Sequence, residues 1–119
     1  MSSEPPAIDL DRLVRAIAHV ETGTTWVREG GALNISITDW REFAHLRPYA
    51  LAQHEAEAMI VAKVMIDSAF EAFLRWRVVP TVPLLAQAWQ SGVSEAMRRG
   101  KENRWSLFAA EVWDQYLNS

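Results

Sequence analysis

The stretch that decides the fold is Leu10–Gly23, which reads LDRLVRAIAHVETG. Its apolar residues recur at helical spacing and form one stripe: Leu10, Leu13, Val14, Ile17 and Ala18. Asp9 and Asp11 are both suitable N-terminal caps for such a helix. Glu21 follows Ile17 by four residues and precedes the helix-ending Gly23. The stretch therefore predicts an amphipathic helix that ends on a single carboxylate at the edge of its buried stripe.

The position of Glu21 favours acid chemistry. The carboxyl end of a helix is the negative end of its dipole, so a further negative charge is unfavourable there. A partly apolar surrounding acts in the same direction, and both effects favour the protonated carboxylic acid. A carboxyl group that keeps its proton near neutral pH is what a general acid requires. The alternative interpretation is a solvent-exposed helix end without a chemical role.

The connection that follows, Thr22–Gly31, contains three glycines and one aromatic residue, Trp26. The ring of Trp26 is either a stacking platform for a sugar or a plug that closes the core. Beyond it, apolar and polar residues alternate, which favours a short extended piece or a small β-hairpin near residues 31–37. Thr38 then predicts the start of a short helix that carries Trp40 and Phe43 on one side.

The rest of the chain has helical patterns separated by proline and glycine. The longest runs from Tyr49 to Arg77 and predicts a central, well-buried helix. Shorter helices are predicted over residues 83–90 and in a segment that ends at residues 98–100. Asn103 is predicted to cap a last, aromatic-rich helix over residues 104–116. The expected fold is mainly α, with about five to six helices.

Length and composition fit a single domain. The chain has 119 residues, of which 50% are hydrophobic and 23% charged, as in globular proteins. Residues 1–7 are polar and contain two prolines, so we expect a flexible lead-in followed by one domain over residues 8–119. We expect no leader sequence, and because the chain has no apolar run of membrane-spanning length, no membrane insertion is expected.

Composition also excludes several kinds of site. The net charge is −3 and no basic stripe is present, which argues against nucleic acid as a partner. The chain has no cysteine, and its three histidines, His19, His45 and His54, lack the spacing of metal ligands. No glycine-rich phosphate loop and no serine elbow occurs, so no metal and no cofactor is expected. The candidate chemistry therefore reduces to Glu21 and the residues that face it.

The order of the motifs along the chain distinguishes between protein families better than any single motif does. A helix ends in Val-Glu-Thr-Gly at Gly23, and GALNI follows at residues 31–35. A threonine-initiated helix, a long helix and the sequence LAQAWQSG at residues 85–92 come next, before an aromatic-rich closing helix. This order resembles the soluble-type lytic transglycosylases of the lysozyme-like superfamily. There the catalytic helix ends in Glu-Ser, Gly-Leu-Met-Gln-Ile follows, and Ala-Tyr-Asn-Ala-Gly comes later. The resemblance covers roughly residues 8–117 and implies a lysozyme-like helical domain.

The resemblance implies site residues position by position. Glu21 matches the catalytic acid, and the other matching or neighbouring positions are expected to bind substrate: Thr22, Trp26, Leu33, Asn34, Trp89 and Gln90. Two departures concern substrate handling. Leu33-Asn34 replaces Met-Gln, which shortens a cleft amide, and Trp89-Gln90 replaces Tyr-Asn, which removes a hydroxyl.

The implied reaction is cleavage of the β-1,4 bond between N-acetylmuramic acid and N-acetylglucosamine in peptidoglycan glycan strands. One glutamate protonates the leaving oxygen and then activates the C6 hydroxyl, giving a 1,6-anhydro product without a second catalytic carboxylate. Asp39 is the nearest second acid and is expected to act instead as the dipole partner of its helix. Attack by water would make the protein a lysozyme. A cell-envelope or phage-associated protein is implied in either case.

Two further hypotheses stay open. One is a catalytically degenerate lysozyme-like domain that binds glycan or acts as a structural or interaction module. The net charge of −3 gives no steering toward anionic peptidoglycan, which supports this alternative. The other is an all-α interaction domain in which the six tryptophans form core and interface.

Overall fold

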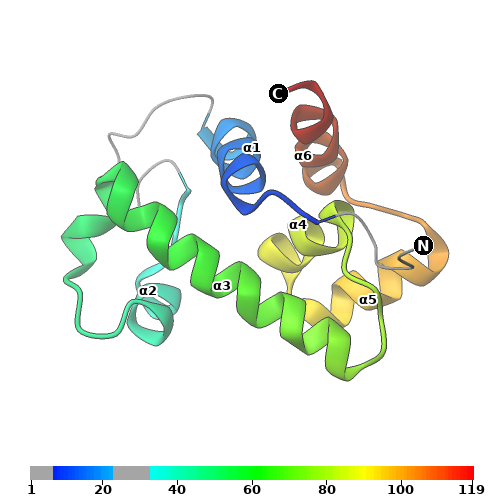
Figure 1. Cartoon of the computed structure of the whole chain (residues 1–119), viewed down its shortest axis with the longest axis horizontal. Coiled ribbons are helices and arrows are strands. Elements are labelled where there is room, and N and C mark those ends of the chain that lie inside the picture. Colours follow the sequence, from blue (N-terminus) through cyan, green and yellow to red (C-terminus); the bar gives the residue numbers. More distant parts are fainter. Residues whose placement is uncertain (1–6, 23–32) are drawn as a thin grey trace.

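The structure, a computed structural model, describes residues 7–22 and 33–119, and within these ranges it contains helices and no strand (Figure 1). The mainly α expectation is therefore confirmed. The elements in chain order are α1 (Leu10–Thr22), α2 (Ile37–Phe43), the 3-10 helix η1 (Tyr49–Gln53), α3 (Glu55–Arg75), α4 (Val82–Ser91), α5 (Val93–Glu102) and α6 (Leu107–Asn118).

Helix α1 begins where the aspartate pattern predicts. Asp9 caps it, because the Asp9 Oδ1 atom accepts a hydrogen bond from the Arg12 N–H group at 3.1 Å. The apolar stripe of α1 is buried from Leu13 onward, with Leu13, Val14 and Ile17 at 0% exposure, whereas Leu10 at the start of the helix is half-buried. The helix packs against α3 and α6, so both neighbours cover the face that the sequence pattern assigns to the core.

Two ion pairs fix the direction of α1 along α3. Asp11 near the start of α1 pairs with Lys63, and Arg15 pairs with Glu55, at 3.5 Å between Nη1 and Oε1. The later residue of α1 thus pairs with the earlier residue of α3. The two helices therefore run in opposite directions. Glu21 lies about 9 Å beyond Arg15 along the helix axis, at the end of the molecule where α3 begins.

The expected extended piece near residues 31–37 does not form in its described part. Residues 33–36 make a turn and a connection, and Ile37 is already the first residue of α2. The physical reason is the hydroxyl of Ser36, which accepts a hydrogen bond from the Asp39 N–H group at 3.1 Å and so caps the helix. Ser36, not Thr38, is therefore the cap. Residues 31 and 32 lie outside the described ranges.

Trp40 joins α2, η1 and the turn before them. Its side chain is 1% exposed, and its Nε1–H group donates to the carbonyl oxygen of Arg47 at 2.7 Å. Its ring meets Tyr49 edge to face, with centroids 6.2 Å apart. The Tyr49 hydroxyl in turn donates to the carbonyl oxygen of Ile35 at 2.7 Å. One buried aromatic pair thereby holds three consecutive segments together.

The long helical pattern is interrupted near its start. Residues 49–53 form η1, His54 has an extended backbone with φ −96° and ψ 120°, and α3 begins only at Glu55. Helix α3 is also less buried than predicted. Its inner face carries Val61 and Phe73 at 0% exposure, whereas its outer face leaves Ile60, Val64 and Leu74 between 40% and 53% exposed. α3 crosses the molecule with one side open to solvent (Figure 1).

The last three helices form a compact group. Gly92, with φ 92°, separates α4 from α5 in a conformation that favours glycine. Asn103 adopts the left-handed conformation with φ 53° and ends α5, instead of capping the last helix as expected. The cap of α6 is Ser106, whose hydroxyl accepts from the Ala109 N–H group at 3.1 Å. Helix α4 packs against both α5 and α6.

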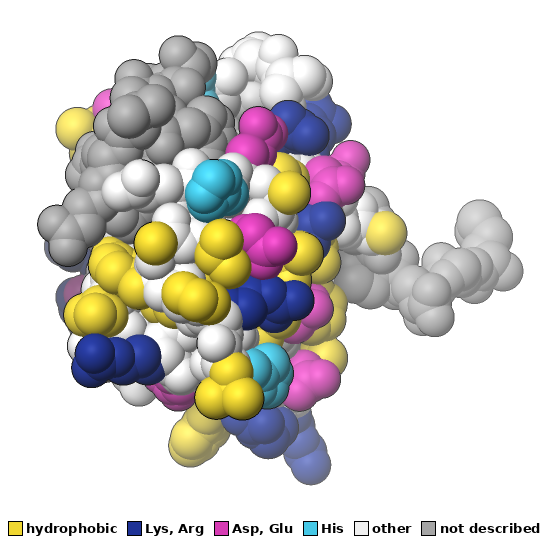
Figure 2. Space-filling view, turned by 90° about the vertical axis from the view of Figure 1, so that its left-hand side faces the viewer, with side chains coloured by type: hydrophobic (Ala, Val, Ile, Leu, Met, Phe, Trp, Pro, Cys, Tyr) yellow, Lys and Arg dark blue, Asp and Glu magenta, His cyan; other side chains and the backbone are white. Residues whose placement is uncertain are grey.

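The surface at the α2 and η1 end is partly apolar. Figure 2 looks onto this end and shows hydrophobic side chains gathered beside basic side chains and histidines. Leu46, in the connection between α2 and η1, is 100% exposed. No helix in the described ranges is long and apolar enough to span a membrane.

Candidate functional site

Glu21 lies in the last turn of α1, one residue before the end of the helix, and its side chain is half-buried. The buried stripe of α1 ends beside it, with Ile17 at 0% and Ala18 at 6% exposure. The carboxyl group is thus held at the negative end of a helix whose other side is anchored in the core. His19 is exposed on the opposite side. The side chain of Thr22 and the whole of Trp26 lie outside the described residues.

A cavity of about 380 Å³ lies between α2, α3 and α4 and reaches the start of α5. Its polar lining comes from three elements: Asp39 of α2, Ser68 of α3 and Gln90 of α4. Its apolar lining includes Phe43, Met65, Ala69, Leu85, Trp89 and Val93. We call this the Trp89 cavity.

The Trp89 cavity combines an aromatic face with a few polar groups. A half-buried indole offers an apolar surface on which a pyranose ring can stack. The Asp39 carboxylate accepts hydrogen bonds and the Gln90 amide can donate them, so both kinds of hydrogen-bonding group are present in the lining. An apolar pocket with a few convergent polar groups is the usual form of a ligand site.

The structure brings together only part of the predicted site. Trp89 and Gln90 both line the Trp89 cavity, and Asp39 joins them there. Glu21 and Asn34 are not among the cavity's described lining residues. Asn34 is exposed and takes a left-handed backbone conformation with φ 52°. The side chain of Leu33 is 0% exposed and packs in the core, so it offers no surface to a ligand.

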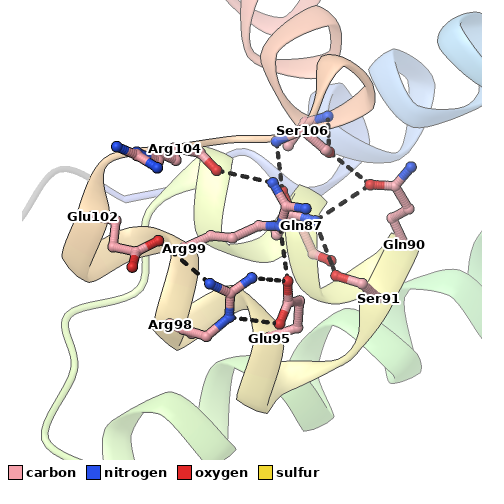
Figure 3. A network of polar contacts seen from close by, with 10 residues as sticks. Gln87, Gln90, Ser91, Glu95, Arg98, Arg99, Glu102, Arg104 and Ser106 are labelled. Carbon is pink, nitrogen blue, oxygen red and sulfur yellow. Dashed lines mark hydrogen bonds and ion pairs between the residues drawn. The ribbon is translucent and has the colours of Figure 1, made fainter.

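A buried amide, Gln87, connects the cavity wall to α6 (Figure 3). Gln87 is 1% exposed, and its Oε1 atom accepts from the Ser106 N–H group at 2.9 Å. Its Nε2 atom donates to Ser91 Oγ at 2.9 Å and to Gln90 Oε1 at 3.3 Å. Every polar atom of the Gln87 side chain therefore has a partner, as a buried amide requires.

The same network sets the orientation of Gln90. Its Oε1 atom accepts from Ser106 Oγ at 2.6 Å and from Gln87 Nε2 at 3.3 Å. Figure 3 shows the nitrogen of the Gln90 amide directed away from both partners. The amide thus offers hydrogen-bond donors on its outer side. The sequence contained no sign of this role for Gln87, because its partner Ser106 is 19 residues away.

Replacing Gln87 by Leu is expected to destabilise the protein by about 1–3 kcal/mol, because the Ser106 N–H group loses its acceptor while the site stays buried. Urea denaturation measures the change. Gln53→Leu, at an exposed position of η1, is the matched control and should shift stability by no more than about 0.5 kcal/mol. Equal midpoints for the two variants would contradict the structural role of Gln87.

Beside this network, α5 carries a cluster of ion pairs. Glu95 contacts Arg98 at 2.9 Å from Nε to Oε2, and Arg99 at 3.0 Å from Nε to Oε1. Arg98 also reaches Glu102 at 3.3 Å, and Arg99 donates to the carbonyl oxygen of Arg104 at 3.0 Å. The hydrogen bond from Arg98, with a further one from Arg99, lowers the pKa of Glu95 from 4.5 to about 2.

This pKa predicts a pH-dependent contribution to stability. Because the pKa of Glu95 is lower in the folded chain, its contribution is complete above pH 4.5 and is lost as the pH falls toward 2. We expect the wild type to lose more melting temperature than Glu95→Gln between pH 6 and pH 2.5. Thermal melts of both proteins at the two pH values measure this. Parallel losses would show that Glu95 does not contribute.

No group of three or more His, Cys, Asp and Glu in the described parts of the chain is arranged to hold a metal ion. No protein-family model matches the chain, and neither the curated proteins nor the solved structures gave a match.

Proposed function

We propose that the protein is a peptidoglycan-cleaving muramidase, acting as a lytic transglycosylase with Glu21 as its acid and base. The observation that carries the proposal is the placement of Glu21. It is half-buried at the carboxyl end of α1, and the stripe beside it is anchored in the core. A carboxyl group at this place, at the end of a helix and partly shielded from solvent, is positioned as a general acid requires.

The order of the motifs along the chain supports the same proposal. The segment around Asn34 follows α1 and enters the core through Leu33 and Ile35, at 0% and 1% exposure. The segment that ends α4 places Trp89 and Gln90 on the wall of a cavity suited to a sugar ring. Together with the end of α1, which carries Glu21, these are the segments that the resemblance to lytic transglycosylases assigns to catalysis and substrate binding.

In the proposed reaction, Glu21 donates its proton to the glycosidic oxygen as the bond between that oxygen and the anomeric carbon of N-acetylmuramic acid breaks. The resulting carboxylate then takes the proton of the muramyl C6 hydroxyl, whose oxygen bonds to the anomeric carbon. The product is a 1,6-anhydro sugar, and Glu21 is protonated again. Since one group acts in both steps, the pair of carboxylates used by most glycosidases is not needed.

A second candidate function is glycan binding without cleavage. The Trp89 cavity is lined by α3 residues from Met65 to Ala72, whereas Glu21 lies at the end of the molecule where α3 begins. A saccharide seated in this cavity alone would not touch Glu21. The observation favours a binding domain in which the carboxyl group has no catalytic role.

Digestion of purified peptidoglycan separates these functions. Soluble products of the wild type and of Glu21→Gln are identified by mass spectrometry, and binding to the insoluble sacculi is measured in parallel. Anhydro-muropeptides from the wild type alone support the transglycosylase, and reducing-end products support a lysozyme. Binding without release by either protein supports the second candidate. If neither release nor binding occurs between pH 4.5 and 7.5, both functions are excluded for this polymer.

A further inference from the structure

The segment that comprises the last two residues of α3 and the start of the connection to α4 (residues 74–79, called the connection below) lies at the opposite end of α3 from Glu21 (Figure 1). Three large apolar side chains project from it: Leu74 is 53% exposed, Trp76 69% and Val79 58%. Arg75 and Arg77 alternate with them along the chain and are themselves exposed. The connection therefore combines exposed apolar groups and cations within six residues.

The connection itself carries only positive charge although the protein is acidic overall. The sequence has no carboxylate between Glu71 and Glu95, while the net charge of the chain is −3. Within the described parts of the chain, neither Arg75 nor Arg77 forms an ion pair, in contrast to Arg98 and Arg99 of α5, which both pair with Glu95. The positive charge of the connection is thus available to an external partner.

A second element extends the surface. An apolar hollow of about 340 Å³ lies between the connection and the second half of α5, lined by Val78, Thr81 and Trp105 among others. Lys101 lies on this hollow, and its own side chain is exposed. A third cation without a described ion-pair partner therefore lies on an apolar recess that Val78 of the connection also lines.

We propose that this connection is a docking site for an anionic lipid bilayer. Tryptophan is favoured at the boundary between lipid headgroups and acyl chains, where Trp76 would insert with Leu74 and Val79. The arginines would lie at the level of the headgroups and be attracted by negatively charged lipids. Trp76 is exposed and both arginines lack a described ion-pair partner, and this combination matches the headgroup region of an anionic bilayer. The proposal does not depend on glycan cleavage.

Cosedimentation with vesicles tests the proposal directly. The wild type is expected to bind vesicles that contain phosphatidylglycerol, to bind neutral phosphatidylcholine vesicles at least tenfold more weakly, and to lose affinity as salt is raised. Each arginine should contribute about fivefold at low salt, so the double variant R75Q/R77Q should bind roughly 25-fold more weakly. Trp76→Ala should weaken binding to the same vesicles without changing the salt dependence.

The control is Arg41→Gln, which removes an exposed cation from α2, away from the connection, and should leave vesicle binding unchanged. Thermal melts establish that the variants remain folded, as expected for exposed positions. The proposal is overturned if the wild type does not bind the anionic vesicles at low salt, which would favour an acidic protein as the partner. It is equally overturned if Arg41→Gln and the double arginine variant lose the same affinity.

Discussion

Replacing Glu21 by Gln is expected to lower the rate of muropeptide release from peptidoglycan by about 10²–10⁴-fold, the usual contribution of a positioned general acid. The amide has nearly the shape of the carboxyl group but cannot supply the proton that the leaving oxygen requires. Because Glu21 is half-buried at the end of α1 and not in the core, the variant should keep its fold. Chromatography of the soluble products at a series of pH values measures the rate.

Two comparisons make this result specific to Glu21. Glu111→Gln removes an exposed carboxylate from α6 and should leave the rate unchanged. Glu21→Asp keeps the acid but shortens its reach, so the rate should fall while the acidic limb of the pH profile remains. If Glu21→Gln releases muropeptides as fast as the wild type, Glu21 is not the acid and the proposed mechanism fails.

The helices could be predicted because their information is local. The stripe of α1 and its cap are encoded within a few consecutive residues: the structure buries the stripe from Leu13 onward and selects Asp9 from the two predicted caps. The errors occur where two local signals compete. Ser36 and Thr38 are both good caps, and the geometry of the preceding turn selects Ser36. Likewise Asn103 fits both a helix start and a helix end, and its left-handed backbone makes it an end.

The candidate site was predicted less completely because it depends on contacts between distant segments. Trp89 and Gln90 share one cavity wall, which their adjacency in the sequence already favours. The approach of Asp39 to that wall depends on how α2 packs on α3, and no spacing in the sequence encodes this packing. The same holds for Gln87, whose bond to Ser106 joins two helices through a buried amide.

The largest expected loss of stability comes from Trp40→Ala, at about 3–5 kcal/mol. The substitution removes a side chain that is 1% exposed and leaves a large cavity beneath α2. It also removes the hydrogen bond to Arg47 and the edge contact that holds Tyr49 in place. Since the Tyr49 hydroxyl binds the carbonyl oxygen of Ile35, the turn before α2 loses its anchor as well.

Urea denaturation of three variants separates these contributions. Trp40→Phe keeps most of the apolar volume and the contact with Tyr49 but loses the hydrogen bond, so about 1–2 kcal/mol should be lost. Trp76→Ala removes a tryptophan that is 69% exposed and should change stability by no more than about 0.5 kcal/mol.

A loss below about 1 kcal/mol for Trp40→Ala would contradict this account. A loss of the expected size is a large part of the 5–15 kcal/mol that stabilises a typical domain. The turn before α2, which contains Asn34, therefore depends on an aromatic pair that follows it in the sequence.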